Sequence, residues 1–594
     1  MRKILDDPIF EIEPSPTSEK VISLKDAVSR YVRPGMLIHT GQTSIRWCSA
    51  IYYEIARQFW GKGGDITLVG VSMNFPQSVL VHGGIVRKII TSYCGDPYYA
   101  PSPNRVYLQA FKDGRLEIEN WSIYTIALRL QAAALGVPFL PTHSLVGSDM
   151  ERDNKDDFIV IDDPFQSGKK TGMVRAIHPD LSVIHAWMAD PEGNAIFPTP
   201  LADNLYGSMA SKEGVILTTE KIVSTETIRK YSHIARLPGN YVKSVTEVPF
   251  GSHPSGMSRV GLDWMELYAE DYEFVEESHQ AAKDPELFQK WVDKWVLSCK
   301  DHNDYIKKLG IDRILKLKGR SHLNSWRFEI DIVDNIPDTE EYTNLEMAIV
   351  AMGRKLVERI VKGNYQTVLA GAGIANLGAW LSYYLLKEQG HSIDLMAEVG
   401  LYGYIPRPTD PALFNLRNVL TCKITTDIFT VIGLFVGGEN GNCIGALGAG
   451  QVDEKGNINT TMTAKDKFIV GSGGGNDVAS RAIEVITIVG HGKSRLPKDV
   501  YYITSPGKTV RTAVTTMGIF EKLDPKKGFT LTGFYPQKGK NKEEIVQEIT
   551  DRCQWTFDVS PDLEEISRPK KRELDLVRIF DPRRYYLGAL PGEK

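Results

Sequence analysis

The sequence predicts two related α/β domains, each an open, mostly parallel sheet with helices on both faces. Three observations predict this fold. The chain has 594 residues, which is more than one hydrophobic core usually supports. Short buried strands alternate with helical patterns, as in βαβ units, and the same landmarks recur in the same order in both halves. We place the domains at residues 1–323 and 342–594, joined by a charged, irregular linker at 324–341.

The first half opens with a short helix at 24–32, which follows a capping box and ends at a Pro-Gly pair. A strand at 36–39, a helix at about 45–59 and a buried strand at 66–71 come next, separated by turns rich in glycine. This order predicts the first βαβ unit of a parallel sheet.

The second half repeats this order. A capping box opens a long amphipathic helix at 344–363, and a strand ending at Leu369, a glycine turn and a second helix follow. The next strand ends in Glu398. The turn DPEGN at 190–194 also matches DEKGN at 453–457, each just after an apolar strand. A duplication explains this shared order better than the general likeness of all α/β proteins.

Composition narrows the function classes. A hydrophobic content of 42%, a charged content of 24% and a net charge of -4 are ordinary for a soluble globular protein and give no support for a nucleic-acid partner. Acids and prolines lie near the N-terminus where a secretory signal would need an unbroken apolar run, and the apolar run at 368–386 contains turn residues that argue against a membrane span. We therefore expect a cytoplasmic protein without a membrane partner. The six cysteines lack ligand-like spacing, which predicts reduced thiols and no metal site.

The stretch IDLMAEVGLYGY, residues 393–404, carries one carboxylate from an apolar strand straight into a glycine. A charged side chain where a buried strand ends is costly to desolvate unless it is paired or has a chemical task. Glu398 could therefore be a solvated or Arg-paired residue, or a catalytic one. The repeat favours catalysis, because the aligned residue of the first half is Val71 and scaffold constraints should act on both halves alike.

A glycine-rich loop is the second feature found in one half only. Residues 471–475 read GSGGG, between a strand and a helix whose cap we predict at Asn476 or Asp477. Such a loop can direct several backbone N–H groups and a helix N-terminus toward a phosphate or a developing oxyanion. A plain tight turn is the alternative, which four glycines in five residues disfavour.

Other motifs are weaker. Gly371, Gly373 and Gly378 have G-x-G-x4-G spacing instead of the dinucleotide fingerprint, so a nicotinamide-dependent dehydrogenase or a non-catalytic nucleotide sensor stays open on this loop alone. Glu439 is another acid before a glycine pattern, but its polar turn predicts exposure. No Walker lysine follows either glycine loop, the histidines show no HExxH or triad pattern, and no GxSxG elbow is present. A lone activated Glu beside an oxyanion site can instead attack an acyl thioester, giving a mixed anhydride and free thiolate, which is the chemistry of CoA transfer.

Several ordered motifs carry a family resemblance. Over nearly its whole length the chain resembles family I CoA-transferases, and most closely the two subunits of glutaconate CoA-transferase placed end to end. The first half is similar to the α-type subunit through SLKDAVSRYVRPG, AAALGVPFLP, DDPFQSGKK and DHNDYIKKLG. The second half is similar to the β-type subunit through YTNLEM, AEVGLYG, DEKGNINTT, GSGGGN and YYITSPG.

The resemblance implies a ping-pong cycle through a glutamyl anhydride and a glutamyl-CoA thioester, with Glu398 as nucleophile and Gly474 as oxyanion donor. It implies that acyl-CoA and carboxylic acids, which could be dicarboxylic, are the substrates, and that coenzyme A is used without a metal or NAD. The resemblance also implies that the two α/β domains are packed face to face with the site between them. We expect a homo-oligomer in which each fused chain carries a complete site. The residues that the resemblance assigns to CoA binding are Gly371, Ala372, Gly373, Ile374, Ala375, Gly471, Ser472, Gly473 and Asn476.

The sequence departs from the family pattern in ways that bear on the substrate. The usual Gly-Gly-Phe turn reads Thr40, Gly41, Gln42, and the acid lies in Glu-Val-Gly where Glu-Ser-Gly is more usual. We assign Gly41, Gln42 and Arg46 to substrate binding; Arg46 could hold a distal carboxylate or form a structural ion pair. Acyl-CoA hydrolases of the same fold rank second, because their catalytic acid is expected at 120–126, which reads NWSIYTI and has no carboxylate here.

Overall fold

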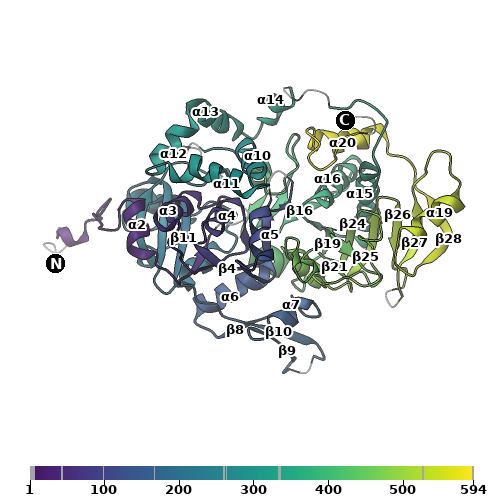
Figure 1. Cartoon of the computed structure of the whole chain (residues 1–594), viewed down its shortest axis with the longest axis horizontal. Helices are drawn as coiled ribbons and strands as arrows, with labels where there is room; N and C mark the ends of the chain where they lie inside the picture. The colour runs from purple at the N-terminus through teal and green to yellow at the C-terminus, as the bar shows by residue number, and fades with distance from the viewer. Residues whose placement is uncertain are drawn as a thin grey trace.

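The computed structural model describes residues 7–590, apart from 42–44, 98–99, 166, 259–260, 263, 266, 332, 334–335 and 525–526. Figure 1 shows two lobes side by side, one formed by the first half of the chain, in purple to teal, and one by the second half, in green to yellow. Each lobe is built around one large sheet covered by helices. The predicted α/β fold class is confirmed.

The sheet of the first lobe follows the order β14-β13-β11-β1-β2-β4-β7, with β12 beside β11. All neighbours along this path are parallel. The central strand β11 is buried along its whole length, as expected for a parallel strand covered on both faces. The strands are β1 (Leu37–Thr40), β2 (Ile66–Val69), β4 (Val86–Thr91), β7 (Glu117–Asn120), β11 (Leu181–Ala189), β12 (Ala195–Ile196), β13 (Val215–Ile222) and β14 (Val242–Glu247).

Helices and smaller sheets complete the first lobe. Two three-stranded sheets are formed by β3 (Ser72–Met73), β5 (Tyr93–Asp96) and β6 (Ser102–Pro103), and by β8 (Phe139–Thr142), β9 (Phe158–Asp162) and β10 (Lys170–Arg175). The helices are α2 (Leu24–Tyr31), α3 (Ser49–Phe59), α4 (Phe75–His82), α5 (Arg105–Lys112), α6 (Ile123–Leu135), α7 (Asp149–Asp153), α8 (Asn204–Ala210), α9 (Thr225–Lys230), α10 (Tyr272–Ala281), α11 (Pro285–Val292), α12 (His302–Leu309), α13 (Ile311–Arg320) and α14 (Trp326–Asp331).

The sheet of the second lobe has ten strands, in the order β18-β17-β16-β15-β19-β24-β25-β26-β27-β28. The five central strands from β16 to β25 are parallel, and antiparallel pairs flank them. These strands are β15 (Thr367–Ala370), β16 (Asp394–Ala397), β17 (Leu401–Tyr404), β18 (Ile424–Thr425), β19 (Cys443–Gly448), β24 (Glu484–Val489), β25 (Val510–Thr515), β26 (Gly518–Glu521), β27 (Thr530–Phe534) and β28 (Asp558–Glu565). The helices are α15 (Asn344–Gly363), α16 (Ile374–Glu388), α17 (Leu416–Thr421), α18 (Gly475–Arg481), α19 (Lys542–Asp551) and α20 (Lys571–Phe580).

The turn that the sequence pairs between the halves has the same hydrogen bonds in both lobes. The carboxylate of Asp190 accepts from the backbone N–H and the side-chain amide of Asn194, at 2.9 and 2.8 Å. Asp453 accepts from the same two groups of Asn457, both at 2.9 Å. These matched turns support the predicted duplication, while the exact domain boundaries stay a prediction.

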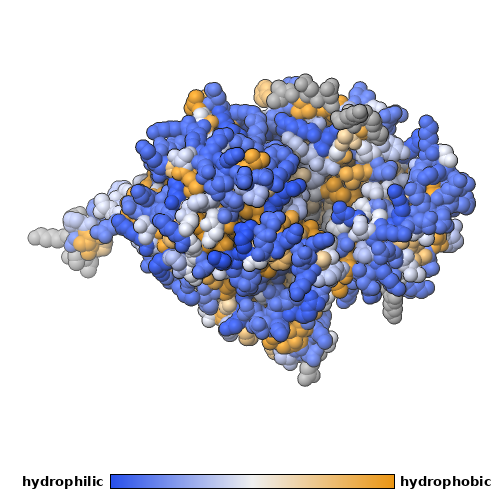
Figure 2. Space-filling model, in the orientation of Figure 1, coloured by the Kyte–Doolittle hydropathy of each residue, from blue (hydrophilic) through white to orange (hydrophobic). Residues whose placement is uncertain are grey.

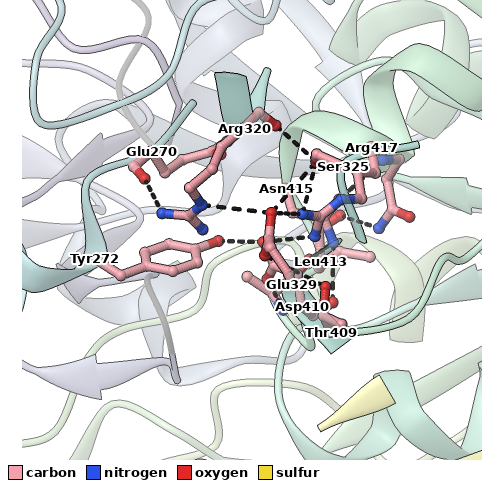
Figure 3. Close-up of polar contacts among 12 residues, drawn as sticks. Glu270, Tyr272, Arg320, Ser325, Glu329, Thr409, Asp410, Leu413, Asn415 and Arg417 are labelled. Carbon is pink, nitrogen blue, oxygen red and sulfur yellow. Dashed lines mark hydrogen bonds and ion pairs between the residues drawn. The ribbon is translucent and has the colours of Figure 1, made fainter. Parts of the chain in front are cut away.

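A buried polar network, shown in Figure 3, joins α13 and α14 to the second lobe. Helix α14 lies within residues 324–341, which were predicted to be irregular. Its Glu329 accepts a hydrogen bond from Arg417 of α17, with which it also forms an ion pair. Arg320 also faces Glu329, with 3.4 Å between Nε and Oε1. Tyr272 donates to Asp410 at 2.6 Å. Because Glu329, Asp410 and Arg417 are buried, this network fixes the seam between the lobes.

The cysteines are free thiols, and all but Cys422 are buried. Burial raises the pKa of Cys48, Cys422 and Cys443 to about 12, which keeps these three thiols protonated near neutral pH. Along the described part of the chain, no helix is both long and apolar enough to cross a membrane.

Candidate active site

Glu398 lies where a central strand of the second lobe ends. Strand β16 pairs in parallel with β15 and antiparallel with β17, and the chain turns at Glu398 between β16 and β17. Gly400 forms this turn with a φ of +123°, and a Cβ there would lie 2.3 Å from the carbonyl oxygen of Thr426. Only glycine fits so close an approach. The turn that presents Glu398 therefore depends on Gly400.

The carboxyl group of Glu398 is buried, and no described residue forms an ion pair with it. The residue is 8% exposed, and within the described chain its Oε2 has no hydrogen-bond partner. Burial raises the pKa of Glu398 to about 7; its own backbone N–H opposes this shift, and the charge of Asp477 adds to it. The structure therefore shows neither the solvated nor the Arg-paired side chain that the sequence left open.

A cavity of about 300 Å³ lies against Glu398 and is lined by both lobes. From the second lobe come Glu398, the turn 371–374 and the loop 471–475, and from the first lobe come Tyr93 and Ile123. Most of the lining is apolar, and no Lys or Arg side chain belongs to its described part. The arrangement places a buried carboxylate against a mostly apolar cavity.

The glycine-rich loop bridges the two lobes. The N–H of Gly473 donates to the carbonyl oxygen of Ser92 at 2.9 Å. Gly474 then faces the carboxyl-bearing side chain, since a Cβ on Gly474 would lie 3.2 Å from Cγ of Glu398. Among the described residues no hydrogen-bond acceptor is found for the Gly474 N–H. The loop therefore holds a backbone donor next to a buried carboxylate.

Most of the predicted CoA-binding residues surround this cavity. Those that line it are Gly371, Ala372, Gly373, Ile374, Gly471, Ser472 and Gly473, and Gly474, the predicted oxyanion donor, lines it as well. Ala375 does not, because its side chain is buried in α16. Asn476 does not either: its amide accepts from the Leu145 N–H and donates to the Thr504 carbonyl oxygen, both at 2.8 Å. These two side chains stabilise the fold instead of facing a ligand.

Two of the three predicted substrate-binding residues, Gly41 and Arg46, are not brought to this cavity. Gln42 lies outside the described residues. At Gly41 a Cβ would lie 2.0 Å from Cδ1 of Ile184, so this glycine is needed for packing. Arg46 is buried, and its guanidinium donates to the carbonyl oxygen of Thr199. Neither Gly41 nor Arg46 belongs to the cavity lining.

Asp477 is a site residue that sequence reasoning did not assign. The predicted cap of α18 is wrong, because Gly474 is its N-cap. Asp477 instead reaches the first lobe, where its carboxylate accepts from Ser122 Oγ at 2.6 Å and from the Tyr124 N–H at 3.0 Å. Burial raises the pKa of Asp477 to about 6. A carboxylate from the second half thus contacts the segment 120–126, which has none of its own. The only signal in the sequence was an acid two residues after the glycine loop.

Comparisons with known proteins give the class of protein. The sequence profile of the family described as Coenzyme A transferase matches residues 21–248 and 440–539, which together make up more than half of the chain. The chain therefore belongs to the coenzyme A transferase family. It is a CoA-transferase enzyme in which the two subunit types are fused.

Individual relatives agree with this assignment. The chain is 31% identical over 314 residues to the A-type polypeptide of glutaconate CoA-transferase from Acidaminococcus fermentans, covering 50% of this chain and 94% of the relative. It is 29% identical to the IpdA polypeptide of the cholesterol ring-cleaving hydrolase from Rhodococcus jostii, covering 48% and 94%. The structure of an acyl-CoA transferase from E. coli O157:H7, in a thioester complex with CoA, superposes with a TM-score of 0.63 at 16% identity, covering 98% of this chain and 100% of that one. That likeness shows that one chain can hold both halves of this fold.

Proposed function

We propose that the protein moves CoA from an acyl-CoA to a carboxylic acid, with Glu398 as the covalent nucleophile. The observation that carries this proposal is a buried carboxylate, without a counter-ion among the described residues, beside a mostly apolar cavity between the lobes. A carboxylate held away from water and from cations keeps its nucleophilicity, which a structural Glu does not need. Membership of the family supplies the class of reaction.

The cycle consists of four displacements. A Glu398 oxygen attacks the thioester carbonyl carbon, the C–S bond breaks, and CoA leaves as a thiolate, so that an acyl–glutamyl anhydride forms. The thiolate then attacks the glutamyl carbonyl carbon, which releases the donor acid as a carboxylate and leaves Glu398 as a CoA thioester. A second carboxylate attacks this thioester, giving a new anhydride and thiolate. The thiolate finally attacks the acyl carbonyl carbon, which produces the new acyl-CoA and regenerates Glu398.

The geometry supports these steps in two ways. The Gly474 N–H can donate to the oxyanion that develops at each attacked carbonyl, in a site where few waters compete. The apolar lining keeps water from the anhydride, which would otherwise be hydrolysed. Because the described lining holds no cation, we expect a short, uncharged acyl group to be preferred over a dicarboxylic one. The homo-oligomer and the cytoplasmic location stay predictions.

Borohydride trapping tests the covalent step. Incubation with acyl-CoA should make the enzyme sensitive to borohydride, because a glutamyl thioester is reduced whereas a carboxylate is not. Mass analysis should then locate the reduced side chain at Glu398, and the Glu398→Gln variant should show no modification. Reduction at another residue, or inactivation without acyl-CoA, would contradict the proposal.

Removing the charge of Asp477 should shift the pH dependence of the reaction. Glu398 attacks only as a carboxylate, so kcat/KM for the first substrate should rise as pH rises through about 7. Because the negative charge of Asp477 helps to raise this pKa, Asp477→Asn should move the midpoint of the profile to lower pH. Pre-steady-state rates of thiolate release, measured from pH 5 to about 9, would show the shift; a midpoint that stays fixed or moves upward would refute it. Retained activity at high pH separates a charge effect from misfolding.

Hydrolysis of acyl-CoA is the second candidate function. The similarity to part of a ring-cleaving hydrolase favours it, and so does the contact of Asp477 with the segment 120–126. In that reaction water would attack the glutamyl anhydride in place of the thiolate. Free thiol released without any added acid would indicate hydrolysis, whereas CoA found on an added labelled acid would indicate transfer.

A further inference from the structure

A second cavity, of about 750 Å³, lies within the second lobe. Three segments supply most of its lining: the turn between β20 (Gln451–Val452) and β21 (Ile458–Asn459), the start of β25 with the residues before it, and the connection from β26 to β27. Strands β25, β26 and β27 lie at the right of Figure 1, and Figure 2 shows mostly hydrophilic residues over this part of the lobe.

This second cavity is separate from the cavity beside Glu398, which we call the acyl cavity. The two cavities share no lining residue in the described part of the chain. Ile458 and Ser505 line the acyl cavity and are joined by backbone hydrogen bonds of 2.9 and 3.0 Å. Their chain neighbours Asn457 and Pro506 line the second cavity instead. A ligand in the second cavity therefore lies outside the site of Glu398.

The second cavity is rich in positive charge, and we call it the basic cavity. Its described lining holds one carboxylate, Glu454, and five cationic side chains, which are Lys455, Lys508, Arg511, Lys522 and Lys527. Lys455 is neutralised by Asp499, at 2.9 Å. No described residue forms an ion pair with Lys508, Arg511 or Lys522. The basic cavity thus presents at least three cations without counter-ions from the described chain.

Two of these cations lie opposite one another on neighbouring strands. The Lys522 N–H donates to the Arg511 carbonyl oxygen at 2.9 Å, directly beyond the pairing of β25 with β26. Side chains at opposite positions share one face of a sheet, where like charges repel. Burial and the charge of Arg511 lower the pKa of Lys522 to about 8, and Asp453 opposes this shift. Nη1 of Arg511 is buried without an acceptor in the described chain, so a bound anion would supply the acceptor and relieve the repulsion.

A lysine at the position of Lys522 is part of the duplicated scaffold. Its Nζ donates to a carbonyl oxygen of the turn between β20 and β21, at 2.5 Å, and to one of the Pro-Gly pair 506–507, at 2.9 Å. In the first lobe, Lys20 Nζ makes the same two hydrogen bonds, to the matching turn 190–194 and the matching Pro-Gly pair 238–239, at 3.0 and 2.7 Å. These hydrogen bonds stabilise the fold in both lobes and do not by themselves indicate a ligand.

The charge around this lysine is not shared between the lobes. The matched positions, with the residue of the first lobe first, are Glu192 and Lys455, Asn240 and Lys508, and Lys243 and Arg511. The second lobe has a cation at all three, even though Glu454 stands in place of Pro191. Lys243 is exposed, whereas Arg511 is half-buried. Scaffold constraints should act on both halves alike, so the positive charge added in one half indicates a binding site.

We propose that the basic cavity binds a phosphate group, either free inorganic phosphate or that of a small phosphate monoester, between Arg511 and Lys508. The planar guanidinium of Arg511 can hold two phosphate oxygens in a bidentate contact, and Lys508 and Lys522 add charge. Three cations without counter-ions attract a phosphate dianion more strongly than a monocarboxylate. The inference does not rest on the proposed function, because the basic cavity lies outside the acyl cavity and can be filled together with it.

Calorimetric titration of the full-length protein tests this site, with inorganic phosphate and glycerol 2-phosphate as probes at constant ionic strength. The Kd for phosphate should rise about tenfold in Lys508→Ala and in Arg511→Gln, the scale of one charged hydrogen bond. Lys243→Ala, at the matched position of the first lobe, is the control and should bind phosphate as wild type does. Tighter binding of glycerol 2-phosphate than of phosphate would assign the site to monoesters, and equal or weaker binding would assign it to the free ion.

Three results would overturn the proposal. They are no binding of phosphate to wild type at millimolar concentration, an unchanged Kd in Lys508→Ala, and displacement of phosphate by CoA, which would place the phosphate in the substrate's own site. Lys508 is exposed on a turn, so Lys508→Ala keeps the fold and decides the question even where Arg511→Gln does not fold. A protein that binds phosphate in this way but transfers no CoA would refute the proposed function and leave the phosphate site standing.

Discussion

Replacing Glu398 by alanine should lower kcat at least about a thousandfold, the scale seen when a covalent nucleophile is lost. The Cβ of alanine cannot attack a thioester, and within the described residues no other carboxyl group lines the acyl cavity. The residual rate would come from binding and from the Gly474 donor alone. Steady-state transfer of CoA from a donor acyl-CoA to a labelled acid measures the effect.

The matched control is Glu439→Ala. Glu439 also lies in a glycine-rich turn of the second lobe, but its side chain is exposed, so its removal should leave kcat within about twofold. Surface substitutions away from such sites rarely matter more than this. An alanine variant at Glu398 that keeps a tenth of the wild-type rate would show that another group makes the covalent bond.

Replacing Arg417 by methionine should lower the free energy of unfolding by about 3–5 kcal/mol, because the negative charge of Glu329 stays buried but loses its main ion-pair partner. Arg417 and Glu329 are 5% and 6% exposed, so water cannot readily replace the lost partner. Arg320 also contacts Glu329, at 3.4 Å, and retains part of the compensation. Chemical denaturation followed by tryptophan fluorescence should show the lower stability.

Two further variants make this prediction specific. Arg417→Met combined with Glu329→Gln should recover part of the stability, because the double variant no longer buries an uncompensated charge. Arg87→Ala breaks an ion pair with Asp65 in which both side chains are largely exposed, and exposed pairs contribute little. If Arg417→Met were as stable as Arg87→Ala, the buried network would not hold the lobes together.

The parts of the fold that follow local patterns could be predicted from the sequence. The capping box of α15 is present, with Thr343 accepting from the Glu346 N–H at 3.0 Å. Strand β16 ends where the apolar run predicts, directly before Glu398. The start of α3 was less predictable. The helix begins at Ser49 and not near 45, since the left-handed φ of 54° at Arg46 is incompatible with a helix at that position.

The contacts that complete the site could not be predicted in this way, because they join residues far apart in the chain. Ser122 and Asp477 are 355 positions apart, and Leu145 and Asn476 are 331 apart. Each of these hydrogen bonds depends on how the lobes dock, and no local periodicity encodes the docking. The repeat supplied the one long-range signal, since the absence of an acid at Val71 singled out Glu398.

The docking of the glycine loop on Ser92 bears on why a fused chain is useful. A cavity lined by two lobes exists only while the lobes are in contact. If the lobes were separate subunits, they would have to associate, and the fraction of complete sites would depend on their concentration. A covalent tether replaces that encounter with an intramolecular one at high effective concentration. Dilution of this protein therefore does not separate the two lobes that line its acyl cavity.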